Sequence, residues 1–128
     1  MLQTVQVHHR FAHHTPRKVR LLADLVRGLT TDRALIQLEL KPQTAAKTLA
    51  KLLRSGIAAA DQANLPANRI VKLVTVDEGP KASRFIPQSR GRASRIVKQQ
   101  SHINLTIGVA EARQPKIQSK TKTKIGSK

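Results

Sequence analysis

The segment from Pro80 to Lys98 constrains the fold of this chain most strongly, because it contains no acidic residue and lies between two strand-like segments. Its cations are Lys81, Arg84, Arg90, Arg92, Arg95 and Lys98. Strand-like segments lie on both sides of it: residues 70–76 divide between two faces of an extended segment, and over residues 103–109 apolar residues alternate with polar ones. The sequence therefore predicts a basic β-hairpin over residues 79–102, with arms of about eleven residues that extend on the order of 35 Å at about 3.3 Å per residue.

A hairpin of this kind needs support from outside the chain. A two-stranded ribbon is only marginally stable in water, and repulsion between its like charges weakens it further. A polyanion would supply the missing stabilisation. The alternative is a solvated loop with an ordinary lysine-rich surface, but such surfaces usually mix both signs of charge.

The whole chain shares the positive charge of this segment. A formal net charge of +17 over 128 residues opposes compaction and attracts phosphate, so nucleic acid or an anionic membrane is the expected partner. A membrane is the weaker candidate, because no apolar run approaches the roughly twenty residues of a spanning helix. The absence of cysteine fits a reducing compartment. The start of the chain lacks the pattern of a signal peptide, so we expect the protein to stay in the cytoplasm.

A strand and three helices are expected before the hairpin. In the strand, over residues 4–11, Val5, Val7 and Phe11 alternate with polar residues and share one face. Apolar residues at helical spacing, with proline and glycine at the boundaries, then predict three helices. These helices cover residues 16–28, 31–41 and 42–64.

Spacing alone also predicts two local details. Arg20 and Asp24 lie one turn apart on the first helix, as in a helical ion pair. In the strand that begins at Ile70, strict alternation puts Val74 and Val76 on the same face as Ile70.

Together these elements indicate an α+β fold. One domain is expected over residues 1–112, with three helices packed on a small antiparallel sheet from which the hairpin extends. Residues 113–128 have low complexity and carry no acidic side chain. They are predicted to form a disordered basic tail.

A histidine cluster near the start of the chain is a candidate metal site, because imidazole binds zinc, nickel and copper. Its members are His8, His9, His13 and His14. However, successive strand residues point to opposite faces, and neither an acid nor a cysteine completes a ligand set. The histidines are expected to face phosphate or solvent, and no metal is predicted.

Catalytic residues are not apparent. Asp77 and Glu78 are the adjacent acids, but in a strand they diverge, and they are expected to mark its end and to pair with nearby arginines. The chain has no nucleotide-binding, hydrolase or metalloprotease motif. We therefore expect no enzyme activity, no cofactor and no small-molecule substrate.

The aromatic content restricts how the chain binds nucleic acid. Phe11 and Phe85 are the only aromatic residues, so the stacking platforms of RNA-recognition sheets are missing. Recognition is expected to rest on phosphate contacts and RNA shape. Arg90 and Arg92 supply two guanidinium forks, and Gly91 between them lets the backbone approach phosphate closely.

An apolar cluster follows the first arm of the predicted hairpin. Phe85, Ile86 and Pro87 either contact bases or another polymer, or pack only on their own hairpin. The sequence leaves both alternatives open.

Three segments resemble a known family. They are RFAHHTPRKVRLLADLVRG from Arg10, KPQTAAKTLAKLLRSGIAAA from Lys41, and VDEGPKASRFIPQSRGRASRIVKQQSHI from Val76. Between about His8 and Val109 the sequence resembles the family of the large-subunit ribosomal protein numbered twenty-two in the bacterial series. The last segment resembles the signature of that family.

The resemblance implies a structural protein of the large ribosomal subunit. Its body would bind large-subunit ribosomal RNA beside neighbouring ribosomal proteins. Its hairpin would line the nascent-peptide exit tunnel, where the tip meets the nascent polypeptide. The ribosome would be cytoplasmic or organellar.

Residue roles follow from the match to the family. The RNA-facing residues it implies are Arg17, Lys18, Arg20, Arg84, Arg90, Arg92, Arg95, Lys98 and His102. Arg10, Lys81 and Gly91 are also predicted to bind RNA, because of their charge or their place in the hairpin. The tunnel-facing tip comprises Phe85, Ile86, Pro87, Gln88, Ser89 and Arg90. Gln88 and Gln99 stand where the family usually carries basic residues, so no phosphate contact is assigned to them.

Two further hypotheses belong to other functional classes. A DNA-binding regulator would use the helices over 31–41 and 42–64 as a helix-turn-helix, with Gln43 and Thr44 reading bases. That hypothesis leaves the hairpin unexplained. The other hypothesis is a module that binds anionic membranes or nascent chains.

Overall fold

The computed structural model describes residues 4–109, which form three helices and a three-stranded sheet. In chain order the elements are β1 (Thr4–Ala12), α1 (Pro16–Val26), α2 (Thr31–Glu39), α3 (Thr44–Gln62), β2 (Arg69–Pro87), a short 3-10 turn (Ser89–Gly91) and β3 (Ala93–Val109). The predicted basic tail, residues 113–128, lies outside the described residues.

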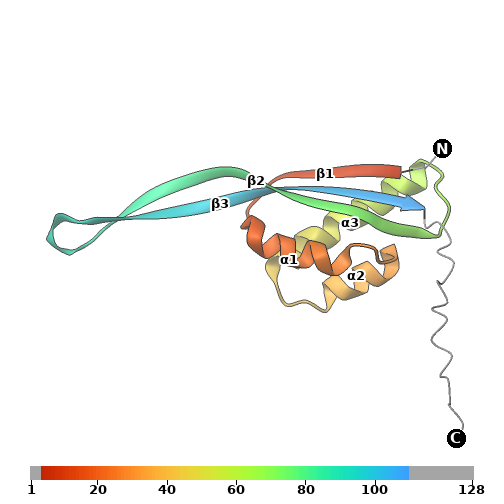
Figure 1. Cartoon of the computed structure of the whole chain (residues 1–128), viewed down its shortest axis with the longest axis horizontal. Helices are drawn as coiled ribbons and strands as arrows, with labels where there is room; N and C mark the ends of the chain where they lie inside the picture. Colours follow the sequence, from red (N-terminus) through yellow and green to blue (C-terminus); the bar gives the residue numbers. More distant parts are fainter. Residues whose placement is uncertain (1–3, 110–128) are drawn as a thin grey trace, which may run out of the picture.

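The sheet is antiparallel, and β3 is its central strand. The strand order is β1-β3-β2. The helices cover one face of the sheet, with α1 against β2 and α3 against β1 and β3, while α2 packs on α3 (Figure 1). The α+β fold predicted from the sequence is therefore confirmed.

The core lies between the sheet and the helical layer. From β3 it takes Ile103, Leu105 and Ile107, which are every second residue and are buried. From the helices it takes Val19, Leu22, Val26, Ala34, Leu38, Ala46, Leu49 and Leu53. Burial of this face is the main stabilising contribution available to so small a body.

The predicted face of one residue in β2 is wrong. The buried residues are Val71, Val74 and Val76, whereas Ile70 is only half-buried. The pairing of β2 with β3 shifts between Val71 and Leu73, where one extra residue enters β2. This bulge changes the phase of the alternation, so that Val71 joins the core.

A second irregularity corrects the predicted position of Phe11. The pairing of β1 with β3 shifts between His9 and Ala12, and Phe11 adopts a positive φ of 57°. As a result Ala12 is buried, and Phe11 is 55 % exposed. The strand therefore ends by turning its alanine, and not its phenylalanine, towards the core.

The predicted ion pair on α1 is also replaced by other contacts. Asp24 accepts a hydrogen bond from Arg27 at 2.8 Å. Arg20 instead donates from Nε and Nη2 to the carbonyl oxygen of Val76, at 3.3 and 3.2 Å. Arg20 thus ties α1 to β2, because an acceptor distant in sequence lies within its reach.

The hairpin extends β2 and β3 beyond the body (Figure 1). Its pairing runs from Lys81 opposite Gln99 to Pro87 opposite Ala93. Every residue over 80–98 is exposed, so this part of the ribbon has no core contact within the described chain. The predicted long basic hairpin is present.

Gly56 allows α3 to lie close to the sheet. A Cβ atom at this position would lie 2.7 Å from Ile107 Cδ1 and 3.2 Å from Val7 Cγ2. We expect Gly56→Val to destabilise the fold by about 2 kcal/mol, because overpacking a closed core typically costs 1–3 kcal/mol. Urea unfolding monitored by circular dichroism measures this change.

The matched control for this substitution is Ala58→Val on the exposed side of α3. It carries only the helix-propensity cost of valine, about 0.5 kcal/mol. Equal destabilisation in the two variants would contradict the close packing of α3 at Gly56.

Candidate nucleic-acid interface

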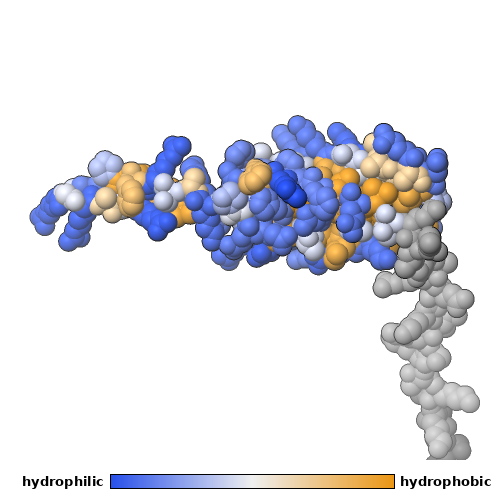
Figure 2. All heavy atoms as spheres, turned by 90° about the horizontal axis from the view of Figure 1, so that it is seen from above, coloured by the Kyte–Doolittle hydropathy of each residue, from blue (hydrophilic) through white to orange (hydrophobic). Residues whose placement is uncertain are grey.

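Both faces of the hairpin mix cations with apolar side chains. On one face Arg84 lies opposite Ile96, and on the other Phe85 lies opposite Arg95. Phe85 is 71 % exposed, so its own hairpin covers only a minor part of the ring. Figure 2 shows hydrophilic side chains projecting around apolar patches along this ribbon. Such a surface offers phosphate contacts together with flat apolar contacts.

The tip is closed by two residues with left-handed backbone. Arg90 has φ 59° and Gly91 has φ 71°. Gln88 N–H donates to the carbonyl oxygen of Arg92 at 2.7 Å, which completes the turn. A Cβ at Gly91 would meet no atom within 4 Å, so it is the backbone conformation that favours glycine here. The close approach of a phosphate to Gly91 stays a prediction.

Lys81, one of the predicted RNA-binding residues, forms an ion pair at the base of the hairpin. Its Nζ lies 2.8 Å from Glu78 Oε2. The hydrogen bond from Lys81, and then its positive charge, lower the pKa of the Glu78 carboxyl below its ordinary value. Lys81 is therefore partly neutralised before any RNA binds.

His102, another predicted RNA-facing residue, holds the end of β1. The backbone N–H of Phe11 donates to His102 Nδ1 at 3.0 Å, and the two rings meet edge to face at 4.9 Å. Because Nδ1 accepts this bond, the neutral ring carries its proton on Nε2. Nε2 is then the ring atom with which His102 would donate to a ligand.

The remaining predicted cations of the body lie on its surface. Arg10, Arg17 and Lys18 are exposed. Arg20 is exposed as well, but its guanidinium already bonds to Val76, so it acts first as a tether between α1 and β2. Sequence spacing could not reveal this tether, because its two ends are 56 residues apart.

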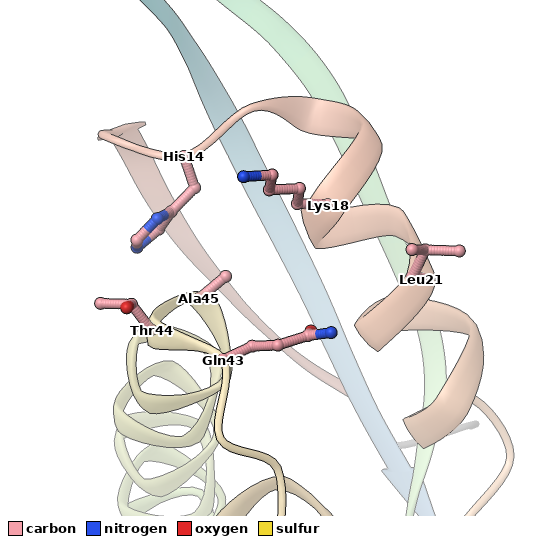
Figure 3. Close-up of a pocket in the computed structure, with 6 residues that line it drawn as sticks. All are labelled: His14, Lys18, Leu21, Gln43, Thr44 and Ala45. Carbon is pink, nitrogen blue, oxygen red and sulfur yellow. The ribbon is translucent and has the colours of Figure 1, made fainter.

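Lys18 lines a cleft between α1 and α3, with a volume of about 380 Å³. Its other lining residues are His14, Leu21, Gln43, Thr44 and Ala45. In Figure 3 Lys18 extends towards His14, and Gln43 reaches across towards α1. His14 Nε2 lies 3.0 Å from Thr48 Oγ1, which links the end of β1 to α3. The sequence suggested Gln43 and Thr44 only as base readers, and the structure groups them with Lys18.

Most acidic side chains of residues 4–109 form an ion pair or a hydrogen bond with another side chain of the chain. The ion pairs of residues 4–109 join Asp24 to Arg27, Glu39 to Arg54, Asp61 to Arg69, and Glu78 to Lys81. Asp77 accepts a hydrogen bond from Asn104 Nδ2 at 3.1 Å. By contrast, no ion pair within these residues involves Arg84, Arg90, Arg92, Arg95 or Lys98. The hairpin beyond Lys81 thus carries five cations and no ion pair.

Residues 4–109 contain neither a metal-binding cluster nor a membrane-crossing helix. No group of three or more histidine, cysteine, aspartate or glutamate side chains is placed to hold a metal ion. None of the helices is both long and apolar enough to cross a membrane.

Comparison with known proteins identifies the family. The family of ribosomal protein L22p/L17e matches residues 7–108, which include the helices, the hairpin root and the whole hairpin. The chain belongs to this family. The resemblance stated from the sequence is therefore confirmed, and the members of the family are structural proteins and not enzymes.

Several relatives carry the name large ribosomal subunit protein uL22. The relative from Anaeromyxobacter sp. (strain Fw109-5) is 47 % identical over 104 residues, which cover 79 % of this chain and 72 % of the relative. That from Geobacter sulfurreducens is 46 % identical over 99 residues, covering 76 % and 89 %. That from Chloroflexus aggregans is 43 % identical over 101 residues, covering 77 % and 88 %.

The ion pair at the hairpin base yields a prediction about titration. Lys81→Gln should raise the pKa of Glu78 towards its ordinary value, because the ammonium that favours the carboxylate is removed. Titration of the carboxyl carbon by NMR measures this pKa. Lys98→Gln, farther along the hairpin, is the control and should leave it unchanged. An unchanged value in Lys81→Gln would mean that another cation determines the pKa.

Proposed function

We propose that this structural constituent of the large ribosomal subunit binds large-subunit ribosomal RNA through its hairpin and lines the nascent-peptide exit tunnel with the hairpin tip. Membership of the family supports the place in the subunit, in the ribosomes of the cytoplasm. The observation that carries the RNA proposal is the exposed segment over 80–98, whose charged residues are all cations. RNA phosphates neutralise such a ribbon and release their counterions.

The proposed RNA contacts divide into two groups. On the hairpin they are Arg84, Arg90, Gly91, Arg92, Arg95 and Lys98, and on the body Arg10, Arg17 and Lys18. Lys81, Arg20 and His102 would contribute after their internal bonds, through the donors that these bonds leave free. Contacts of this type fix position and carry little sequence information.

The DNA-binding alternative has weaker support. A recognition helix presents residues of its N-terminal turn to the major groove. Here Gln43 and Thr44 line the cleft that α3 forms with α1. The helix-turn-helix hypothesis also gives no role to the exposed hairpin.

We expect the triple substitution Arg90→Ala, Arg92→Ala and Arg95→Ala to weaken binding to large-subunit ribosomal RNA. The slope of log affinity against log salt should fall in magnitude by about 0.7 to 0.9 for each phosphate that the variant no longer neutralises. Filter binding or anisotropy over a range of salt concentrations measures the slope.

Arg33→Ala, an exposed arginine on α2, is the control for removal of charge away from the hairpin. An unchanged slope in the triple variant would contradict RNA binding by the hairpin. Preference of the wild-type chain for duplex DNA over structured RNA in competition would favour the regulator hypothesis instead.

The position of the tip is tested on translating ribosomes. A photoreactive cross-linker attached through Gln88→Cys should react with the nascent chain, because Gln88 lies at the exposed tip. The same group attached through Gln37→Cys, on the exposed side of α2, should not react with it. Cross-links to RNA or protein of the outer subunit surface from Gln88→Cys, without nascent-chain products, would contradict tunnel lining.

A further inference from the structure

A second cationic surface lies in the helical layer, apart from the hairpin. A groove with a volume of about 380 Å³ separates α2 from α3. The charged residues that line it are Lys41, Lys47, Lys51, Arg54 and Glu39. None of these residues belongs to the RNA contacts proposed above. The groove therefore needs a separate explanation.

The cations of α3 form a single row along this groove. Lys47, Lys51 and Arg54 are separated by four and three residues, so they share one side of the helix. The row spans about 10 Å of the helix axis at 1.5 Å per residue. Like charges one turn apart destabilise an isolated helix. An external anion would relieve this repulsion.

Of the three cations in this row, only Arg54 forms an ion pair with a carboxylate of the described chain. Glu39 Oε1 lies 2.6 Å from Arg54 Nη2, and both side chains remain more than half exposed. The one acid of α3, Asp61, pairs with Arg69 away from the groove. Within residues 4–109 no ion pair involves Lys41, Lys47 or Lys51. An ordinary solvated surface would intersperse both signs of charge here.

We propose that the groove between α2 and α3 binds a second phosphodiester segment of RNA, separate from the segment held by the hairpin. This inference rests on the proposed function. The lysines supply point charges that suit phosphate, and Glu39 holds the Arg54 guanidinium at the groove while leaving its other donors free. A concave cationic surface also concentrates the field that attracts phosphate. The body would then be fixed at two places on the RNA, which sets the direction of the hairpin.

The test compares salt dependence in full-length variants. Lys47→Gln with Lys51→Gln keeps good helix formers and removes two charges. The slope of its binding to large-subunit ribosomal RNA should fall in magnitude by about 1.4 to 1.8 relative to the wild type, because two phosphates are no longer neutralised. The matched control, Arg33→Gln with Lys72→Gln, removes two exposed charges outside the groove and should keep the wild-type slope.

Acetylation of lysines provides a readout without substitution. In the wild-type complex, RNA should protect Lys47 and Lys51 from acetic anhydride, while Lys72 stays reactive. Unprotected groove lysines together with a wild-type slope in the groove variant would overturn the inference. If such a variant also failed to retain an acidic ribosomal protein in assembled subunits, the groove would belong to a protein partner.

The same measurements separate this inference from the proposed function. A wild-type chain that fails to bind large-subunit ribosomal RNA contradicts both. A wild-type chain that binds, and whose hairpin variant shows the reduced slope while the groove variant does not, contradicts only the groove.

Discussion

The continuity of β3 is the constraint on which the rest of the structure depends. From Ser101 to Gly108 the strand lies between β1 and β2, and its residues Ile103, Leu105 and Ile107 are buried beneath the helices. Before Ser101 it pairs with β2 alone and forms one arm of the hairpin. Packing in the core therefore fixes the position of β3, and the exposed hairpin arm is part of the same strand. The direction in which the cations project follows from packing that takes place entirely in the body.

The root of the hairpin explains why several predicted RNA-binding residues have structural bonds. At the level where β1 ends, His102 accepts a hydrogen bond from Phe11, and Arg20 donates to Val76. Lys81 pairs with Glu78 across a further register shift of β2, which lies between these two residues. These contacts support the root of the hairpin, where β1 has ended and no longer pairs with β3. A cation at the root therefore first supports the ribbon, whereas a cation beyond it is available to a partner.

Alternation and helical spacing are sufficient to predict the elements, the α+β fold and the exposed basic hairpin, because these depend on patterns within one segment. The bulges between His9 and Ala12 and between Val71 and Leu73 could not be predicted in this way. Each inserts a residue without changing local composition, and so moves Val71 into the core and Phe11 out of it. The bond from Arg20 to Val76 could not be predicted for a related reason, since its acceptor is a backbone carbonyl contributed by a distant strand. The exposure of the cations between Arg84 and Lys98 could be predicted, because no other element of the described chain covers them.

The body and the hairpin differ in what stabilises them, because the acidic residues lie in the body and at the hairpin base. Ion pairs involving Asp24, Glu39 and Asp61 reduce repulsion among the cations of the body, which also has a buried core. The ribbon beyond Lys81 has neither advantage, and its tip places Arg90 at a positive φ, a conformation that costs roughly 1–3 kcal/mol for a residue other than glycine. Its strands are nevertheless aligned by their continuation into the sheet, so a polyanion need not align them on binding. A partner of opposite charge would therefore stabilise a ribbon whose strands are already paired at the root, and it would not have to bring them together.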